Sequence, residues 1–142
     1  YRIALDSPAV QIGLPEVKLG LLPGAGSSVR LPRKIGPTRA KYLLYTGEFV
    51  PAEQLVEAGL VNEVVDDADL MPAAQRLVAK LVPKSSLVLR RMKALVDDGL
   101  EQPSETALRL ELLASEVHSH SHDMREGLAA FEEKRKPQFK GC

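Results

Sequence analysis

The sequence predicts an α/β fold in which short strands and turns occupy residues 1–66 and helices occupy residues 67–142. Two observations support this division. Before Asp66, brief β-rich runs alternate with glycine and proline, which is typical of short strands joined by tight turns. After Asp66, apolar residues recur at the i, i+3, i+4 and i+7 spacing of amphipathic helices. We therefore expect the end of an α/β core followed by a helical region.

Extended and helical segments alternate in the first part. Extended stretches are expected at residues 1–5, 11–13, 16–19 and 61–65. Helices are expected at residues 27–35, 38–45 and 51–59. The sequences Gly36-Pro37, Gly47 and Gly59 end these helices, and Pro51 occupies a first-turn position.

Four helices are expected after Asp66. Their apolar stripes are Met71, Ala74, Leu77, Val78 and Leu81; Leu89, Met92 and Val96; Leu110, Leu113, Ala114 and Val117; and Met124, Leu128 and Phe131. Pro83 and the segments 99–103 and 118–122 separate them. These stripes carry more apolar surface than a short chain can bury on itself. We therefore expect them to pack on a further part of the same protein or on another subunit.

Charge and cysteine content exclude several classes of function. Lys plus Arg (19) equal Asp plus Glu (19), so no global field recruits nucleic acid or an anionic membrane, and an anionic ligand needs a local basic cluster. The single cysteine, Cys142, excludes a disulfide framework and favours a reduced, cytoplasmic protein; its thiol at the chain end is expected to be inert. No apolar run is long enough for a bilayer, and the first residues do not form a signal peptide. The chain starts in what reads as a strand already under way, so we interpret it as a piece of a longer protein.

Glu16 is the first candidate for chemistry. It follows Pro15, whose ring fixes φ. Apolar residues flank it in sequence: Leu14, Val17, Leu19, Leu21 and Leu22. A carboxylate held among apolar side chains has its charged form disfavoured, which suits a group that moves a proton on and off carbon. The alternative is a solvated glutamate at a strand edge.

The glycine-rich stretch at residues 20–28 is the second candidate. It is not a P-loop, because no lysine follows the glycines, and Val29 stands where a dinucleotide-binding motif has its third glycine. What remains is a compact turn whose backbone N–H groups lead into a helix N-terminus. Such a turn can hold a water, an oxyanion or a phosphate. The alternative is a purely structural turn.

Three segments together resemble the crotonase (enoyl-CoA hydratase/isomerase) family. They are GLPEVKLGLLPGAGSSVRLPRKIG, TGEFVPAEQLVEAGLVNEVV and SHDMREGLAAFEEKRKPQFKG, in the family's order. The resemblance implies the C-terminal half of that fold, in which residues 1–66 end a spiral of ββα units. Residues 67–142 then form a helical region that covers the substrate and builds trimers, often paired into hexamers.

The resemblance also implies a function. The substrate is an acyl-CoA thioester, which carries its own coenzyme A, so no separate cofactor and no metal is expected. Two backbone N–H groups stabilise the enolate. Glu16 matches the glutamate that exchanges the α-carbon proton, and Gly24 matches the glycine whose backbone helps to place the water.

The family's other catalytic glutamate and both enolate-binding amides match positions upstream of Tyr1. The chain alone is therefore expected to be inactive, and to work with an N-terminal part of the same protein. The leading hypothesis for the intact protein is hydration of trans-2-enoyl-CoA. A Δ3,Δ2-enoyl-CoA isomerase, in which the matching glutamate shuttles the proton alone, and an inert oligomerising fragment are the alternatives.

The tail carries a basic cluster and a histidine run. The cluster comprises Lys134, Arg135, Lys136 and Lys140. The resemblance implies that Lys134 meets the phosphates of coenzyme A bound by a neighbouring subunit; the alternative is a solvated helix end. His118 and His122 would share one face of a continuous helix, which makes a metal site conceivable. The ligand set is incomplete, however, and Ser121 reads as a helix N-cap with Asp123 in the first turn, so no metal is expected.

Overall fold

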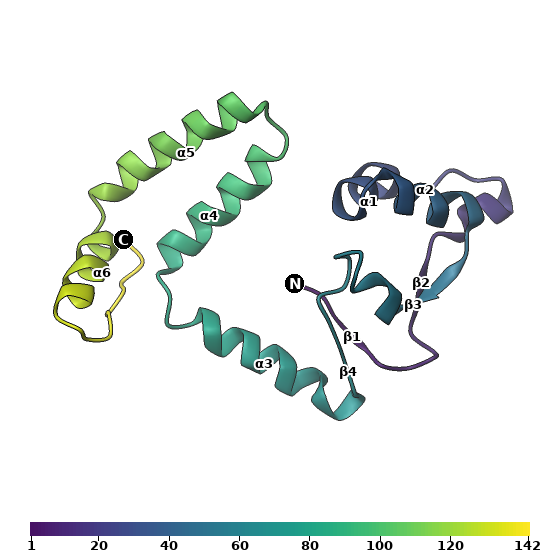
Figure 1. Ribbon diagram of the computed structural model, residues 1–142, viewed down its shortest axis with the longest axis horizontal. Helices are drawn as coiled ribbons and strands as arrows, with labels where there is room; N and C mark the ends of the chain where they lie inside the picture. Colours follow the sequence, from purple (N-terminus) through teal and green to yellow (C-terminus); the bar gives the residue numbers. More distant parts are fainter. The chain divides into compact units, whose positions relative to one another are not determined.

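The computed structural model describes residues 1–142 and divides into two compact units, Tyr1–Leu77 and Val78–Cys142. The predicted α/β class is confirmed: the strands lie in the first unit and the longest helices in the second (Figure 1). The boundary falls inside α3 (Leu70–Leu81), which follows a short 3-10 turn, η3 (Asp67–Asp69).

Two pairs of short strands frame the first unit. β1 (Ile3–Leu5) runs parallel to β4 (Glu63–Val65), and β2 (Gln11–Gly13) runs antiparallel to β3 (Phe49–Pro51). β1, β2 and β4 fall within predicted extended stretches. β3 was not predicted, because Pro51 read as a helix start.

Two expectations for this unit were wrong, one for an extended stretch and one for a helix. Residues 16–19 are not extended: Pro15 starts a 3-10 helix, η1 (Pro15–Leu19), because its fixed φ suits a first helical turn. Gly20, at φ 69°, closes η1 by donating its N–H to the Val17 carbonyl at 3.2 Å. The helix expected at residues 51–59 shrinks to a 3-10 turn, η2 (Ala52–Leu55), because the Leu55 carbonyl accepts from the N–H groups of residues 60 and 61 instead of continuing a helix.

The helices α1 (Ser27–Ile35) and α2 (Pro37–Thr46) match their predicted positions. They pack against each other, and η1 packs on α2. The buried core comprises Ile35, Ala40, Leu43, Ala52, Leu55 and Val61. α2, which contributes Ala40 and Leu43 to this core, contacts η1, the segment that carries Glu16.

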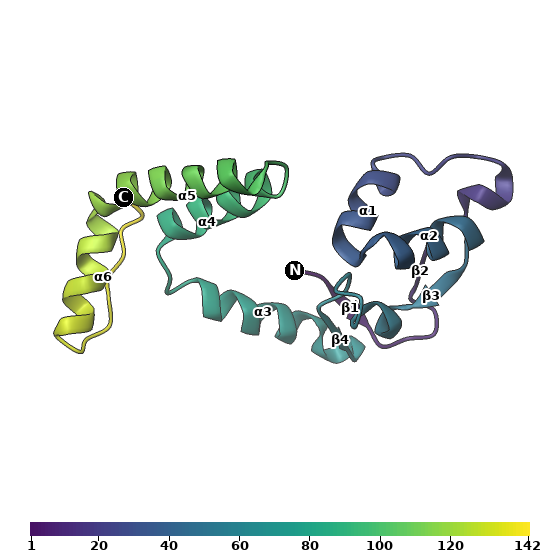
Figure 2. The same cartoon turned by 45° about the horizontal axis from the view of Figure 1, so that its top comes forward.

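The second unit contains three further helices: α4 (Ser86–Gly99), α5 (Ser104–Ser119) and α6 (His122–Glu132). Together with α3 they confirm the four predicted helices. α4 and α5 lie side by side as an antiparallel hairpin in both views (Figures 1 and 2). Ser121 caps α6 as predicted, accepting from the Met124 N–H at 3.1 Å. None of the helices is long and apolar enough to cross a membrane.

Little apolar surface is buried within the second unit. Ala130 is its one buried hydrophobic residue, and the other two buried residues, Ser85 and Asp123, are polar. Large apolar side chains on α5 stay exposed, among them Leu112, Leu113 and Val117. Polar contacts are therefore prominent among the interactions that hold this unit together.

The strand pair β2–β3 depends on glycine at position 13. A Cβ at Gly13 would lie 2.7 Å from the Glu48 carbonyl oxygen and 2.8 Å from the Phe49 ring. Backbone cannot yield as a flexible side chain can, so we expect Gly13→Ala to destabilise the first unit by about 1–3 kcal/mol. Chemical denaturation measures this. Gly24→Ala, where no atom lies within 4 Å of the added Cβ, is the matched control; equal stability of the two variants would contradict the prediction.

Candidate functional site

Glu16 lies in η1 with one carboxylate oxygen shielded and unbonded. The side chain is half-buried, and its Oε2 is buried without a hydrogen-bond partner. Buried polar atoms are usually paired, so this oxygen is an exception that calls for a reason. A carboxylate that no ion pair or hydrogen bond engages at Oε2 is chemically able to take up and release a proton there.

The expected apolar enclosure of Glu16 is only partly present. Four of its flanking residues are exposed: Val17, Leu19, Leu21 and Leu22, the last by 91%. The physical reason is that η1 and the left-handed Gly20 turn these side chains outward, whereas a strand would have alternated them across two faces. Apolar residues that are neighbours of Glu16 in the sequence therefore do not enclose its carboxylate in the fold.

η1, which carries Glu16, packs against α2. Gly47 follows α2 at φ 61°, and a Cβ there would lie 2.9 Å from Val17 Cγ1. Lys18 Nζ lies 6.0 Å from the centre of the Phe49 ring, within the range of a cation–π contact. The absence of a side chain at Gly47 thus lets η1 approach the end of α2.

The glycine-rich turn around Gly24 has the predicted form. The Gly24 carbonyl accepts hydrogen bonds from the Ser27 N–H at 3.0 Å and from the Ser27 Oγ at 2.9 Å. Ala25 and Gly26 follow with φ of 52° and 80°, and the Arg30 guanidinium donates to the Ala25 carbonyl. α1 then starts without a side-chain cap, and the N–H groups of Ser27 and Val29 donate to the carbonyls of Gly24 and Gly26. The role of Gly24 itself stays a prediction.

Lys134 ends α6 in a conformation that lysine rarely adopts. Its φ is 54°, and it occupies the position where glycine is usual: Lys134 N–H donates to the Phe131 carbonyl at 3.2 Å, and Arg135 N–H to the Ala130 carbonyl at 3.0 Å. The side chain is exposed, and no hydrogen bond or ion pair engages its ammonium group. Glu16 and Gly24 belong to the first unit and Lys134 to the second.

Phe131 was expected only as a member of an apolar stripe and received no functional role from the sequence. The apolar spacing placed it on a stripe that the chain was not expected to bury on itself, and the side chain is 84% exposed, three residues before Lys134. An exposed aromatic ring three residues from an exposed cation suits a flat, negatively charged ligand. The only signal in the sequence was a phenylalanine three positions before the basic cluster.

Arg135 is not available to a ligand. It pairs with both oxygens of Glu126, at 2.6 and 2.9 Å, and with Glu133 at 2.5 Å. The hydrogen bonds from Arg135, followed by one from the Gln138 N–H, lower the pKa of Glu126 to about 2, and the same carboxylates raise the pKa of Arg135. The tail is thereby fastened along α6.

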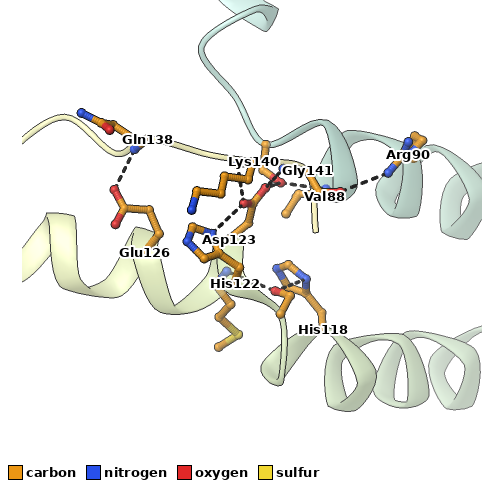
Figure 3. Close-up of polar contacts among 12 residues, drawn as sticks. Val88, Arg90, His118, His122, Asp123, Glu126, Gln138, Lys140 and Gly141 are labelled. Carbon is orange, nitrogen blue, oxygen red and sulfur yellow. Dashed lines mark hydrogen bonds and ion pairs between the residues drawn. The ribbon is translucent and has the colours of Figure 1, made fainter.

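Asp123 forms the buried centre of a polar clasp (Figure 3). It is 2% exposed and accepts from Ser85 Oγ at 2.5 Å and from the backbone N–H groups of Lys140 at 2.7 Å and Gly141 at 2.9 Å. Burial alone raises the pKa of this carboxyl, but the hydrogen bonds from Ser85, Lys140, Gly141 and His122 outweigh it and lower the pKa to about 2. Because its oxygens are occupied, Asp123 holds the start of α4, the start of α6 and the tail together.

The three histidines do not form a cluster. α5 ends at Ser119 and α6 begins at His122, so His118 and His122 are not on one continuous helix. His118 Nδ1 lies 3.1 Å from Ser121 Oγ, and His122 Nδ1 lies 3.4 Å from Asp123 Oδ1. No group of three or more His, Cys, Asp or Glu residues could hold a metal ion. Cys142 is free and exposed.

Comparisons with known proteins agree with the resemblance read from the sequence. A family model described as enoyl-CoA hydratase/isomerase matches residues 1–142. The chain is 37% identical to crotonyl-CoA hydratase of Syntrophomonas wolfei, over 98% of this chain and 53% of that protein. It is 40% identical to an enoyl-CoA isomerase/hydratase of Mycosarcoma maydis, over 99% and 51%.

Solved structures give the same result. An enoyl-CoA hydratase from Bacillus anthracis superposes with a TM-score of 0.93 at 39% identity, covering 100% of this chain and 54% of that one. An enoyl-CoA hydratase from Geobacillus kaustophilus gives a TM-score of 0.93 at 38% identity, covering 99% and 53%. The chain spans about half the length of the curated relatives it matches.

Proposed function

Because this chain belongs to the enoyl-CoA hydratase/isomerase family, we propose that it supplies the C-terminal half of an enzyme that hydrates trans-2-enoyl-CoA thioesters. The observation that carries the proposal is the shielded, unbonded Oε2 of Glu16. An oxygen already committed to an ion pair could not exchange a proton with substrate without first breaking that pair.

Glu16 acts as the acid that protonates the α-carbon. Hydration breaks the C=C π bond and one O–H bond of water, and it forms a C–O bond at the β-carbon and a C–H bond at the α-carbon. Glu16 Oε2 delivers the α-proton, while the turn at Gly24 helps to hold the water. The enolate-stabilising amides and the glutamate that activates water come from a preceding part of the same protein. Coenzyme A arrives with the substrate, so the reaction needs no separate cofactor.

Lys134 binds the coenzyme A end of the substrate. Its exposed ammonium pairs with a phosphate, and exposed Phe131 offers a flat face to the adenine base. Arg135 is committed to Glu126 and Glu133; among the exposed lysines of the cluster, Lys134 is the one that takes the left-handed conformation just beyond α6. The site is shared between subunits of a trimer or hexamer; the exposed apolar side chains of α5 support such an assembly.

A hydration assay tests the activity. The full-length protein is given a short trans-2-enoyl-CoA, and the loss of absorbance of the conjugated thioester is followed. Turnover to the 3-hydroxyacyl-CoA supports the proposal. Acyl-CoA binding without turnover would contradict it and favour an inert assembly module.

Isomerisation of 3-enoyl-CoA is the second candidate, because Glu16 is the one carboxylate in this chain that is matched to the catalytic role. The relative from Mycosarcoma maydis carries both activities in its name. Supplying 3-enoyl-CoA in place of the trans-2 isomer separates the two. Conversion of the 3-enoyl substrate without hydration of the trans-2 substrate would favour the isomerase.

Lys134→Gly is expected to trade binding for stability. Glycine adopts the left-handed conformation without the steric cost that lysine bears, so the second unit gains about 1 kcal/mol. Loss of the exposed cation weakens coenzyme A binding roughly threefold to fivefold. Thermal melting and titration with coenzyme A measure the two effects, with Lys136→Gly as the control for a nearby lost charge. Unchanged coenzyme A binding in Lys134→Gly would remove Lys134 from the site.

A further inference from the structure

The turn that ends α6 holds Lys134 in a strained backbone conformation. Its φ of 54° lies in the left-handed region, which residues other than glycine seldom adopt. Such a conformation persists only where the surrounding structure fixes it. The two backbone hydrogen bonds that close the turn, from the N–H groups of Lys134 and Arg135, are available to any sequence. The side chains around the turn therefore decide how firmly Lys134 is held.

Glu126 ties the segment beyond Lys134 to α6. Its carboxylate accepts from both terminal nitrogens of Arg135, at 2.6 and 2.9 Å, and from the Gln138 N–H at 2.7 Å. The last of these bonds is drawn in Figure 3. Arg135 and Gln138 follow Lys134 in the chain, whereas Glu126 lies inside α6. One side chain thus bridges from the helix to the segment that leaves it.

A second carboxylate, that of Glu133, also contacts Arg135 but is placed differently. Glu133 precedes Lys134 in the turn itself, and its side chain is 60% exposed, whereas that of Glu126 is 15% exposed. An exposed ion pair is screened by water and contributes little, while a shielded pair in which both carboxylate oxygens accept from arginine is stronger and directional. Glu126 is therefore the residue that anchors the turn.

We propose that Glu126 is the positioning residue for coenzyme A binding: through Arg135 and the Gln138 backbone it holds the left-handed turn from which Lys134 reaches a phosphate. Glu126 does not itself contact the ligand. A lysine whose backbone is fixed before binding loses less conformational freedom when it pairs with a phosphate, and this favours binding. The inference rests on the coenzyme A-binding role proposed above for Lys134.

The sign of the change in affinity separates positioning from simple charge. Removing a carboxylate near a phosphate-binding cation strengthens the binding of a polyanion through the electrostatic field alone. Loss of positioning weakens it. We expect Glu126→Gln in the full-length protein to bind coenzyme A roughly threefold more weakly, because an effect that acts through Lys134 cannot exceed the loss of its charge. Glu132→Gln, which removes an exposed carboxylate of the same helix, is the control and is expected to bind no more weakly than the unmodified protein.

A double variant shows whether Glu126 acts through Lys134. Glu126→Gln combined with Lys134→Gly is expected to bind coenzyme A as Lys134→Gly does alone, whereas independent structural damage would add to the loss. Additive losses, or unchanged or tighter binding in Glu126→Gln while Lys134→Gly binds more weakly, would overturn the positioning role and leave that of Lys134 intact. Unchanged binding in Lys134→Gly would overturn both.

Amide hydrogen exchange on the unmodified full-length protein tests the same coupling if Glu126→Gln fails to fold. If the closed turn binds coenzyme A more tightly than the open one, coenzyme A must favour the closed turn by the same factor. Saturating coenzyme A is therefore expected to slow exchange of the Gln138 amide, which is bonded to Glu126, by roughly threefold. Equal exchange with and without coenzyme A would overturn the proposal.

Discussion

Glu16→Gln in the full-length protein is expected to slow hydration by at least about a hundredfold, the usual contribution of a positioned acid or base. Glutamine keeps the shape of the side chain but has no proton to deliver to carbon. Since Glu16 does not bind the coenzyme A end, KM is expected to change little while kcat falls. Steady-state kinetics on a short trans-2-enoyl-CoA measures both constants.

Exchange of the α-proton gives a sharper readout of the same role. In deuterated water the reverse reaction washes deuterium into the α-position, and this exchange is expected to fall together with kcat in Glu16→Gln. Glu57→Gln, an exposed glutamate of the first unit, is the matched control. A rate and an exchange that both survive Glu16→Gln would remove the acid/base role from this residue.

Sequence reasoning succeeded where structure is set by local rules. The starts of α1 and α6 and the stop at Gly36 follow from capping residues, glycine and proline at short spacing. It failed where distant segments decide. β3 forms because β2 pairs with it. The pairing requires glycine at position 13, because a Cβ there would come too close to the Glu48 carbonyl.

For the candidate site, too, some features could be predicted from the sequence and others appear only in the folded chain. Glu16 could be chosen from its neighbours and from the family resemblance, but its shielded, partnerless Oε2 is a property of the folded chain. Asp123 carried no signal of its burial, because an aspartate after an N-cap is ordinarily exposed. Only the packed second unit reveals that its carboxylate has several hydrogen-bond donors.

Asp123→Ala is expected to lower the melting temperature of the second unit by about 5 °C or more. The change leaves Ser85 Oγ and the backbone N–H groups of Lys140 and Gly141 without their buried acceptor, and an unsatisfied buried donor is costlier than a missing bond. Amide hydrogen exchange at Lys140 and Gly141 is expected to accelerate, which locates the damage in the clasp. Glu132→Gln, an exposed residue of α6, is the control; equal exchange in both variants would contradict the prediction.

The pH dependence of stability follows from the same carboxylate. Its pKa is lowered in the folded chain from 3.8 to about 2, so folding favours the ionised form. Its contribution is therefore complete above pH 4 or so, declines as the unfolded chain takes up a proton, and is lost as the pH falls through about 2. Glu126, whose pKa is lowered from 4.5 to about 2 by Arg135, acts in the same direction. Asp123→Asn is expected to flatten this acid limb, since it removes the proton uptake; an unchanged slope between pH 4 and pH 2 would mean that other carboxylates govern acid unfolding.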